Sequence, residues 1–326
     1  MKGANFPGFS GVSVGELLLY AYRSGAWTPI PYQIDEVNIT GTYVVSEDGR
    51  LDANDELVFM AADAGSSVTT AFWPADTLSR LYARYVISVT DPLSAGANAW
   101  VYLYRSTTLS KSGVSYITWN HAAQTATAIS YTAAFSPTVF VGLSDLFINS
   151  RNVDILDRQK TRVATLIGTL NEETIVGLLG PATVTLPAVG PVRAATNDGD
   201  LSAAFYGSRV DFDVIFDLSA FPVLPSFIRT SFDWNNPAVT SITTYRDSNT
   251  PGGVPINGVT DTVPMTPRNE WFQVNGGAAG PGGLVVAIPN LDPSGGTVSN
   301  YYKDNSAIDP NDTGDRRSYG DAGLRI

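Results

Sequence analysis

Short segments of the chain alternate apolar and polar residues with a period of two. Between residues 78 and 90, Tyr85 and Val89 lie on an apolar face, and polar side chains dominate the other face. This period is that of a half-buried β-strand. After a turn, the segment 99–105 returns as the expected antiparallel partner. Its aromatic stripe consists of Trp100, Tyr102 and Tyr104. Such a stripe is typical of cross-strand packing, and it can also serve as a platform for stacking sugars.

Near the N-terminus, the segment 12–22 is apolar on both sides, as in the interior of a sandwich. The turn at 23–26 contains glycine and predicts a hairpin with the segment 27–37.

Two later segments combine the alternation with an unusually charged outer face. In 209–218 and 227–234, apolar residues occupy nearly every second position. We expect these strands to pair across the connection 222–225 with their apolar sides inward, so that one surface gathers the charged residues. The charged residues are Arg209, Asp211, Asp213, Arg229 and Asp233.

This shared face has two interpretations. Carboxylates and arginines at cross-strand spacing neutralise one another and give a solvated sheet face. Alternatively, the face is a concave groove that binds sugar hydroxyls, with Trp234 or Trp271 stacking at its rim.

Three residues are candidates for catalysis. Asp211 and Asp213 would lie about 6.5 to 7 Å apart at Cα on one strand face, a spacing that permits glycosidase chemistry without choosing a mechanism. The third candidate is His121, the single histidine, because imidazole is a common general acid or base, although in a turn a histidine is often solvated or capping. Whether the chain is an enzyme stays open.

The stretch 49–62 packs acids tightly against an apolar run. Calcium needs about six to eight oxygen ligands in a flexible loop. The stretch departs from the EF-hand pattern, because the glycine after the third acid and the closing glutamate are missing. It is either an Asx turn that begins a strand or a calcium loop. The candidate ligands are Asp48, Asp52, Asn54, Asp55 and Glu56.

The C-terminal segment is acidic again and forms either a second calcium loop or a solvated terminus. Its candidate ligands are Asp304, Asn305, Asp309, Asn311, Asp312 and Asp315. If calcium binds, we expect chelation to lower the melting temperature, because an ion bound only to the folded state adds stability.

The densest charge run is 154–162 (Asp-Ile-Leu-Asp-Arg-Gln-Lys-Thr-Arg). Charged residues four apart can share a helical face, but a strand-like segment follows. The run predicts a solvated strand or a one-turn helix that leads into a strand.

The amino-acid composition limits the kinds of catalytic and metal sites that the chain can form. The 326 residues include no cysteine and one histidine, which excludes disulfides, thiol nucleophiles and zinc-thiolate or multi-histidine centres. Oxygen-ligated ions such as calcium remain, and we expect no nucleotide, haem or zinc. A net charge of −11 without a basic cluster argues against nucleic acid as a partner.

The expected location is extracellular or at the cell surface. No apolar run approaches the roughly 20 residues of a membrane span, and no signal-peptide core follows Met1. Low lysine and abundant threonine, serine and glycine are typical of exported proteins, so we expect a secreted chain without its signal peptide.

The pattern predicts an all-β fold, a large antiparallel two-sheet sandwich with long acidic loops and little helix. It fits one domain over 1–326, or two sandwiches over 1–112 and 113–326. The segments 100–104, 190–193 and 209–217 together resemble the large two-sheet sandwiches of exported carbohydrate-active proteins, the galactose-mutarotase-like group. With one histidine, no catalytic residue of that group is carried over.

Two functions follow. The first is an extracellular carbohydrate-binding or carbohydrate-processing sandwich that takes a polysaccharide or glycan on the 209–233 face. The second is a structural or assembly module of a cell surface or extracellular filament, which self-associates through strand edges and metal-tied loops without catalysis. Fold analogy does not choose between them, because function resides in sites.

Overall fold

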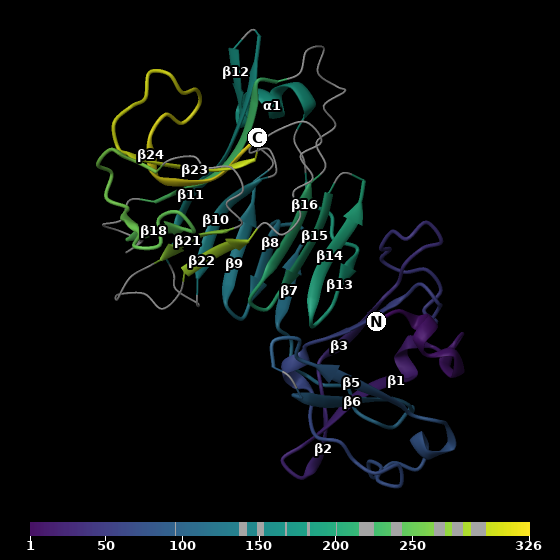
Figure 1. Ribbon diagram of the computed structural model, residues 1–326. Coiled ribbons are helices and arrows are strands. Elements are labelled where there is room, and N and C mark those ends of the chain that lie inside the picture. The colour runs from purple at the N-terminus through teal and green to yellow at the C-terminus, as the bar shows by residue number, and fades with distance from the viewer. Residues whose placement is uncertain are drawn as a thin grey trace. The chain divides into compact units, whose positions relative to one another are not determined.

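A computed structural model of the chain describes residues 1–94, 96–136, 142–148, 153–166, 168–180, 183–199, 201–214, 225–235, 243–263, 271–275, 283–287 and 298–326 (Figure 1). Strands make up 48% of the structure and helices 8%, in several antiparallel sheets. The predicted all-β class is therefore confirmed. The described strands form six sheets where the sequence predicted two, because many of them are only four or five residues long and end at turns.

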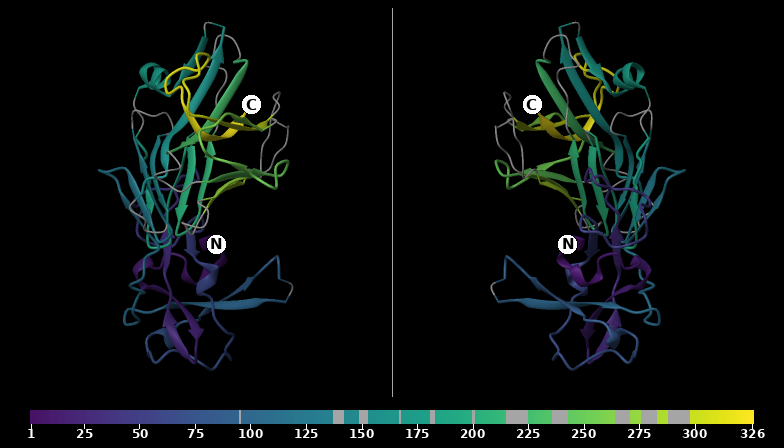
Figure 2. Two further views of the ribbon diagram at one scale, coloured as in Figure 1. Left: turned by 90° about the vertical axis from the view of Figure 1, so that its left-hand side faces the viewer. Right: turned by 90° about the vertical axis from the view of Figure 1, so that its right-hand side faces the viewer.

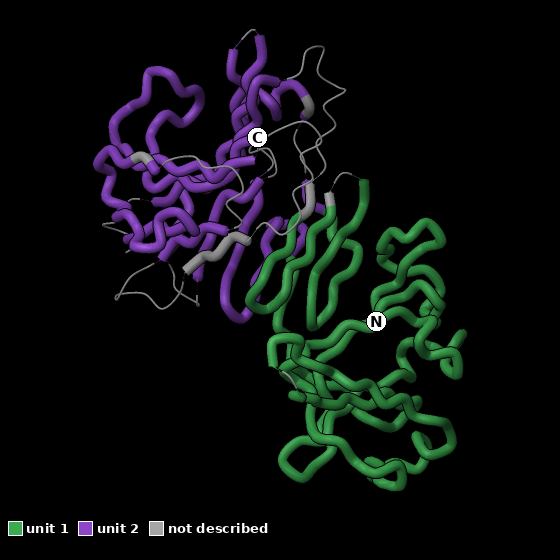
Figure 3. Tube along the Cα trace, viewed as in Figure 1, with its two compact units in different colours: residues 1–119, 185–215 green, residues 120–184, 216–326 purple. Residues whose placement is uncertain are grey.

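Contacts divide the chain into two compact units, and each unit is built from two separate segments (Figure 3). Unit 1 comprises Met1–Trp119 and Thr185–Ile215, and unit 2 comprises Asn120–Val184 and Phe216–Ile326. The predicted schemes of one domain, or of two divided at residue 112, stay predictions.

Unit 1 contains a sheet in the order β2-β1-β6-β5, a sheet in the order β13-β14-β15-β16 and the ladder β3-β4. Its strands are β1 (Leu17–Arg23), β2 (Ala26–Pro29), β3 (Tyr32–Asp35), β4 (Glu56–Phe59), β5 (Tyr85–Thr90), β6 (Asn98–Arg105), β13 (Ala188–Val189), β14 (Arg193–Asp198), β15 (Leu201–Tyr206) and β16 (Val210–Val214). Five 3₁₀ turns accompany them: η1 (Gly3–Asn5), η2 (Pro7–Phe9), η3 (Val14–Glu16), η4 (Ala61–Asp63) and η5 (Ser79–Leu81).

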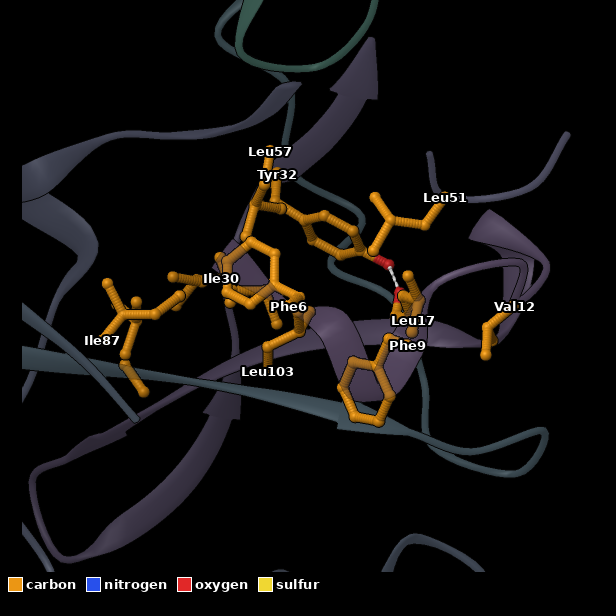
Figure 4. Close-up of a cluster of buried hydrophobic side chains, with 13 residues drawn as sticks. Phe6, Phe9, Val12, Leu17, Ile30, Tyr32, Leu51, Leu57, Ile87 and Leu103 are labelled. Atoms are coloured by element: carbon orange, nitrogen blue, oxygen red, sulfur yellow. Dashed lines mark hydrogen bonds between the residues drawn. The ribbon is translucent and has the colours of Figure 1, made fainter. Parts of the chain in front are cut away.

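The strand β1 is a central strand and is buried on both sides along Leu17–Ala21, as the sequence predicted. Ser24 and Gly25 have positive φ (50° and 83°), and this backbone makes the tight turn into β2. One face of β1 lies in the apolar core of unit 1, where the Tyr32 hydroxyl donates a hydrogen bond to the Leu17 carbonyl (Figure 4).

The strand predicted over 78–90 is shorter in the structure. Only β5 is extended; η5 precedes it, and Leu81 in that turn is 71% exposed. Asp76 accepts a hydrogen bond from the Ser79 amide at 2.7 Å, which favours the turn over a strand. The partner β6 pairs as predicted, with Ile87 opposite Val101.

Unit 2 contains a six-stranded sheet in the order β12-β11-β17-β24-β23-β20, a sheet in the order β19-β18-β21-β22 and the ladder β10-β9-β8. Its strands are β8 (Thr125–Ala128), β9 (Tyr131–Phe135), β10 (Leu143–Ile148), β11 (Leu156–Thr165), β12 (Gly168–Asn171), β17 (Phe227–Trp234), β18 (Thr244–Asp247), β19 (Val254–Pro255), β20 (Asp261–Thr262), β21 (Trp271–Asn275), β22 (Gly283–Ala287), β23 (Ser299–Asn305) and β24 (Ser318–Arg325). The boundary between the units falls in β7 (Ile117–Asn120).

The α-helix α1 (Glu172–Leu179) follows β12, and the sequence analysis did not predict it. Asn171 begins the helix by accepting a hydrogen bond from the Thr174 amide at 2.8 Å. Two glutamates occupy the first turn, where the helix dipole favours negative charge. The start of α1 contacts the loop that joins β23 to β24, because the side chain of Asn171 donates a hydrogen bond to the Thr313 hydroxyl at 3.3 Å, and Figure 2 shows the helix beside this loop.

Candidate functional site

The two charged strands that were predicted to share one face lie in different sheets. β16 pairs with β15, whereas β17 pairs with β11 on one side and β24 on the other. They also belong to different units. The predicted pairing and the groove built on it are therefore wrong; alternation assigns side chains to two faces, but it does not select the neighbouring strand.

The charged residues around β16 are on the surface. Arg209 and Asp211 form an ion pair, 2.9 Å from Nε to Oδ1, with side chains 66% and 51% exposed. Phe212, which was expected to face inward, is 46% exposed, although its ring meets that of Phe205 edge-on at 5.5 Å. The side chain of Asp213 lies outside the described part of the structure.

The candidates on β17 are buried. Asp233 is 1% exposed, Arg229 8% and Trp234 0%, so Trp234 is not at a rim. Trp271 lies on β21 and is half-buried. His121 is exposed in the turn that follows β7.

The aromatic stripe on β6 packs inside unit 1. Tyr102 and Tyr104 are fully buried, and Trp100 is half-buried. The packing interpretation therefore holds for Tyr102 and Tyr104, because neither ring presents a face to solvent.

The first acidic stretch is held by hydrogen bonds within the protein. Asp55 is 1% exposed and accepts from the amides of Val37 (3.1 Å) and Asp52 (2.7 Å), while the Asn54 amide group donates to the Val37 carbonyl. Asp48 caps the amide of Arg50 at 2.7 Å. The contact of Asp48 is that of an Asx turn, whereas Asp55 and Asn54 tie the stretch to Val37, which precedes it in the chain. Calcium at this stretch stays a prediction.

Glu56 belongs to an ion-pair centre around Arg193 in unit 1. Arg193 donates to Glu56 at 2.6 Å through Nη2 and to Asp35 at 2.8 Å through Nε. Lys2 and the hydroxyl of Tyr43 contact the same glutamate at 2.7 and 2.8 Å. A cavity of about 410 Å³ opens beside Glu56 and Arg193. The carboxylate of Glu56 is therefore already paired with the cationic side chains of Arg193 and Lys2.

Most of the charge run 154–162 lies in β11, and the exposure of its charged side chains changes along the strand. Asp157 is exposed and Arg158 is half-buried, whereas Lys160 is 0% exposed and Arg162 is 1% exposed, so the predicted solvated strand is wrong for Lys160 and Arg162. In register, Lys160 lies opposite Ser231, and Arg162 opposite Arg229. Two arginines directly opposite one another repel, so this sheet face requires anions above it.

The loop 306–317 between β23 and β24 supplies two of those anions. Asp312 contacts both arginines, at 2.8 Å to Arg162 Nε and 3.4 Å to Arg229 Nη2. Asp315 contacts Lys160 Nζ at 3.1 Å. We call this set of buried charged residues, together with the half-buried Asp312 and Asp315 that cover them, the covered network. Its members are Lys160, Arg162, Glu172, Arg229, Asp233, Asp312, Asp315 and Asp321.

The rest of the predicted C-terminal ligand set is also engaged. Asp304 accepts from the amides of Asn257 (2.7 Å) and Gly258 (2.9 Å), and Asp309 pairs with Lys303. The side chain of Asn305 caps Ala307, and the Asn311 amide donates to Asp309. These contacts order the loop, and a bound calcium there stays a prediction.

Burial and charge shift the acids of the covered network in opposite directions. Burial raises the pKa of Asp312, but the charges of Arg229 and Arg162 outweigh it, and the net pKa is lowered. Lys160 acts in the same way on Asp315, whose pKa is also lowered. Burial dominates at Glu172 and Asp233, and it raises the pKa of both, that of Asp233 well above its usual range.

Three acids of unit 2 have the spacing of a metal site. Among the described residues, one carboxylate oxygen each of Asp157, Asp233 and Asp315 lies within 4.8 Å of the other two. The ammonium of Lys160 already contacts two of them, at 2.5 Å to Asp233 and 3.1 Å to Asp315. The positive charge of Lys160 therefore offsets part of the negative charge of these three acids.

Sequence reasoning missed Lys160, Arg162, Glu172 and Asp321 as parts of a site. The sequence Asn171-Glu172-Glu173 carries the signature of a helix start and could have placed Glu172. No local signal links β11 to a loop about 150 residues away.

The described residues include no helix that is long and apolar enough to cross a membrane. Comparison of the chain with known protein families, with curated proteins and with solved structures found no match. The resemblance to the galactose-mutarotase-like group therefore stays a prediction.

Proposed function

We propose that this chain is a structural or assembly module of a cell surface or extracellular filament, and that it associates with copies of itself. The observation that carries the proposal is the covered network. Four of its members were candidates for binding a sugar or a metal ion: Arg229, Asp233, Asp312 and Asp315. In the structure these groups pair with charged side chains of the network, which fasten the loop 306–317 and α1 to a sheet. Charges used in this way stabilise one conformation and leave few groups to recognise a sugar.

The sheet β13-β14-β15-β16 offers edges for association. Its end strands each expose an apolar side chain, Val189 on β13 (49%) and Phe212 on β16 (46%). An end strand also presents backbone groups that can pair with a strand of another copy. Both features favour a second copy of the chain as the partner.

The experiment is to follow the molar mass of the purified chain by light scattering over a range of concentrations. We expect the mass to increase with concentration and polymers to be visible by electron microscopy. A lysine on an edge strand blocks pairing, so Val189→Lys or Phe212→Lys should shift the chain toward monomer.

Leu93→Lys is the matched control, because Leu93 is 95% exposed in a turn and does not lie on an end strand. It should leave assembly unchanged. A wild-type chain that stays monomeric at every concentration contradicts the proposal. Binding to a polysaccharide panel that is lost in Asp211→Ala would instead support the carbohydrate hypothesis.

A further inference from the structure

We propose that Lys160 and Asp233 condense to form an intramolecular amide bond that joins β11 to β17. The two residues lie on adjacent strands, because Lys160 is opposite Ser231 and Asp233 is two positions further along the same face. Lys160 Nζ lies 2.5 Å from Asp233 Oδ2. This proposal does not depend on the proposed assembly function.

Both reacting groups are withdrawn from water. The side chain of Lys160 is 0% exposed and that of Asp233 is 2% exposed. An amine and a carboxyl group held in contact react as one molecule rather than as two, which removes most of the entropic cost of their encounter. The amide is neutral, so its formation also removes two charges from a buried site, where charges are costly.

The step balances without an oxidant or a cofactor. Lys160 enters as an ammonium and Asp233 as a carboxylate. One proton moves from Nζ through a neighbouring carboxylate to Asp233, and the neutral amine then attacks Cγ of the protonated Asp233. The Nζ–Cγ bond forms and the Cγ–O bond breaks. The oxygen leaves as water with the relayed proton and a second proton from Nζ.

The surroundings of the pair determine where the protons lie. Burial raises the pKa of Asp233 well above its usual range, and the charge of Asp321 raises it further. Burial lowers the pKa of Lys160, but the charges of Asp321, Asp233 and Asp315 outweigh it and the net pKa is raised. The raised pKa of Asp233 favours the protonated carboxyl that the amine attacks, and the raised pKa of Lys160 favours the ammonium, so reaction requires a proton to leave Nζ within the cluster.

Two carboxylates are available to carry that proton. Asp315 Oδ2 lies 3.1 Å from Lys160 Nζ and can accept it directly. Asp321 is 0% exposed, its charge acts on both reacting groups, and neither of its oxygens has a hydrogen-bond partner in the described structure. Its ion pair with Arg229 is long, at 3.9 Å, and a buried carboxylate without a hydrogen bond is costly, so a role in proton transfer accounts for its position.

The test is the mass of the purified full-length chain after denaturation. We expect it to be lower than the sequence mass by one water molecule. Trypsin does not cleave after an acylated lysine, so digestion should give the peptide 159–162 joined to the peptide 230–246. The full sequence mass together with a free Gln159-Lys160 peptide overturns the proposal, because it shows a non-covalent ion pair only.

Substitutions test whether the amide bond joins the side chains of Lys160 and Asp233. Lys160→Arg should restore the sequence mass, with an unchanged far-UV circular dichroism spectrum as evidence that the chain folds. Lys303→Arg is the matched control. Lys303 lies on β23 of the same sheet and pairs with Asp309 of the loop 306–317, but their side chains are 21% and 22% exposed, and the variant should still lack one water. Asp233→Asn should lose ammonia in place of water and give the same joined peptides.

Discussion

The strands β16 and β17 carry the same alternation of apolar and charged residues, yet their charged residues lie in opposite environments. Asp211 on β16 is half exposed and pairs with Arg209 at the surface. Arg229 and Asp233 on β17 are buried beneath the loop 306–317. β16 ends its sheet, whereas β17 lies inside a six-stranded sheet. The comparison shows that a charged strand face need not be a solvated face.

The physical reason lies in what covers each face. Arg229 on β17 and its neighbours Lys160 and Arg162 on β11 attract the acids of the loop 306–317. Those acids hold the loop against the sheet. On β16 the neighbouring arginine and aspartate neutralise one another. Variants of the two regions should therefore differ strongly in their effects on stability.

Arg162→Met should give the largest loss. The substitution removes the closest cation of both Glu172 and Asp312 and leaves them only longer contacts, with Arg158 (3.5 Å) and Arg229 (3.4 Å). Removing one member of a buried ion pair costs about 3–5 kcal/mol. Urea unfolding measures the loss. The double variant Arg162→Met/Glu172→Met removes both charges of one pair and should recover part of it. A loss below about 1 kcal/mol in the single variant would show that the network adds little to stability.

Gly323→Ala tests the close packing beneath the covered network. Gly323 lies opposite Ser231, and a Cβ there would be 2.1 Å from the Thr230 carbonyl oxygen and 2.4 Å from Ser231 Cα. The strands would have to separate, at a cost of about 2 kcal/mol. Gly113→Ala is the control, because nothing lies within 4 Å of its added Cβ. Equal unfolding midpoints for the two variants would contradict this prediction.

Glu56→Gln should destabilise unit 1 in a pH-dependent way. Burial raises the pKa of Glu56, but hydrogen bonds from Lys2, Arg193 and Tyr43 outweigh it and lower the pKa from 4.5 to about 2. A lowered pKa in the folded state stabilises the fold above pH 4.5, and this stabilisation disappears as the pH falls toward 2. Because Glu56 is partly exposed, we expect a difference of about 1–2 kcal/mol at neutral pH.

The measurement for Glu56→Gln is urea unfolding of wild type and variant from pH 7 down to pH 2. Their stabilities should converge at the acidic end of this range. A difference that stays constant with pH would indicate that the substitution acts through packing rather than through charge.

Asp211→Ala should have the smallest effect. The ion pair with Arg209 is solvated on both sides, and such pairs contribute at most about 1 kcal/mol. We expect a change within about 0.5 kcal/mol in urea unfolding. A loss as large as that of Arg162→Met would show that β16 is also covered, and it would remove the contrast between the two strands.

Some features were determined by the sequence alone. The apolar run of β1 and the Ser24-Gly25 turn predicted a buried strand and its hairpin, and the 99–105 segment predicted β6. Alternation also predicted that the 209–218 and 227–234 segments contain strands. Side-chain period and turn chemistry act over a few residues, so they can be followed in the sequence.

Only the tertiary structure decided which strands are neighbours and which charged faces are covered. Lys160 reaches Asp315 across 155 positions of the chain, and β17 pairs with β11 rather than with β16. Pairing of strands and closure of loops depend on contacts between distant segments, and a period of two is the same whichever neighbour a strand finds. The sequence therefore determined the strands, and long-range packing placed the charges of β17 inside the protein and those around β16 at its surface.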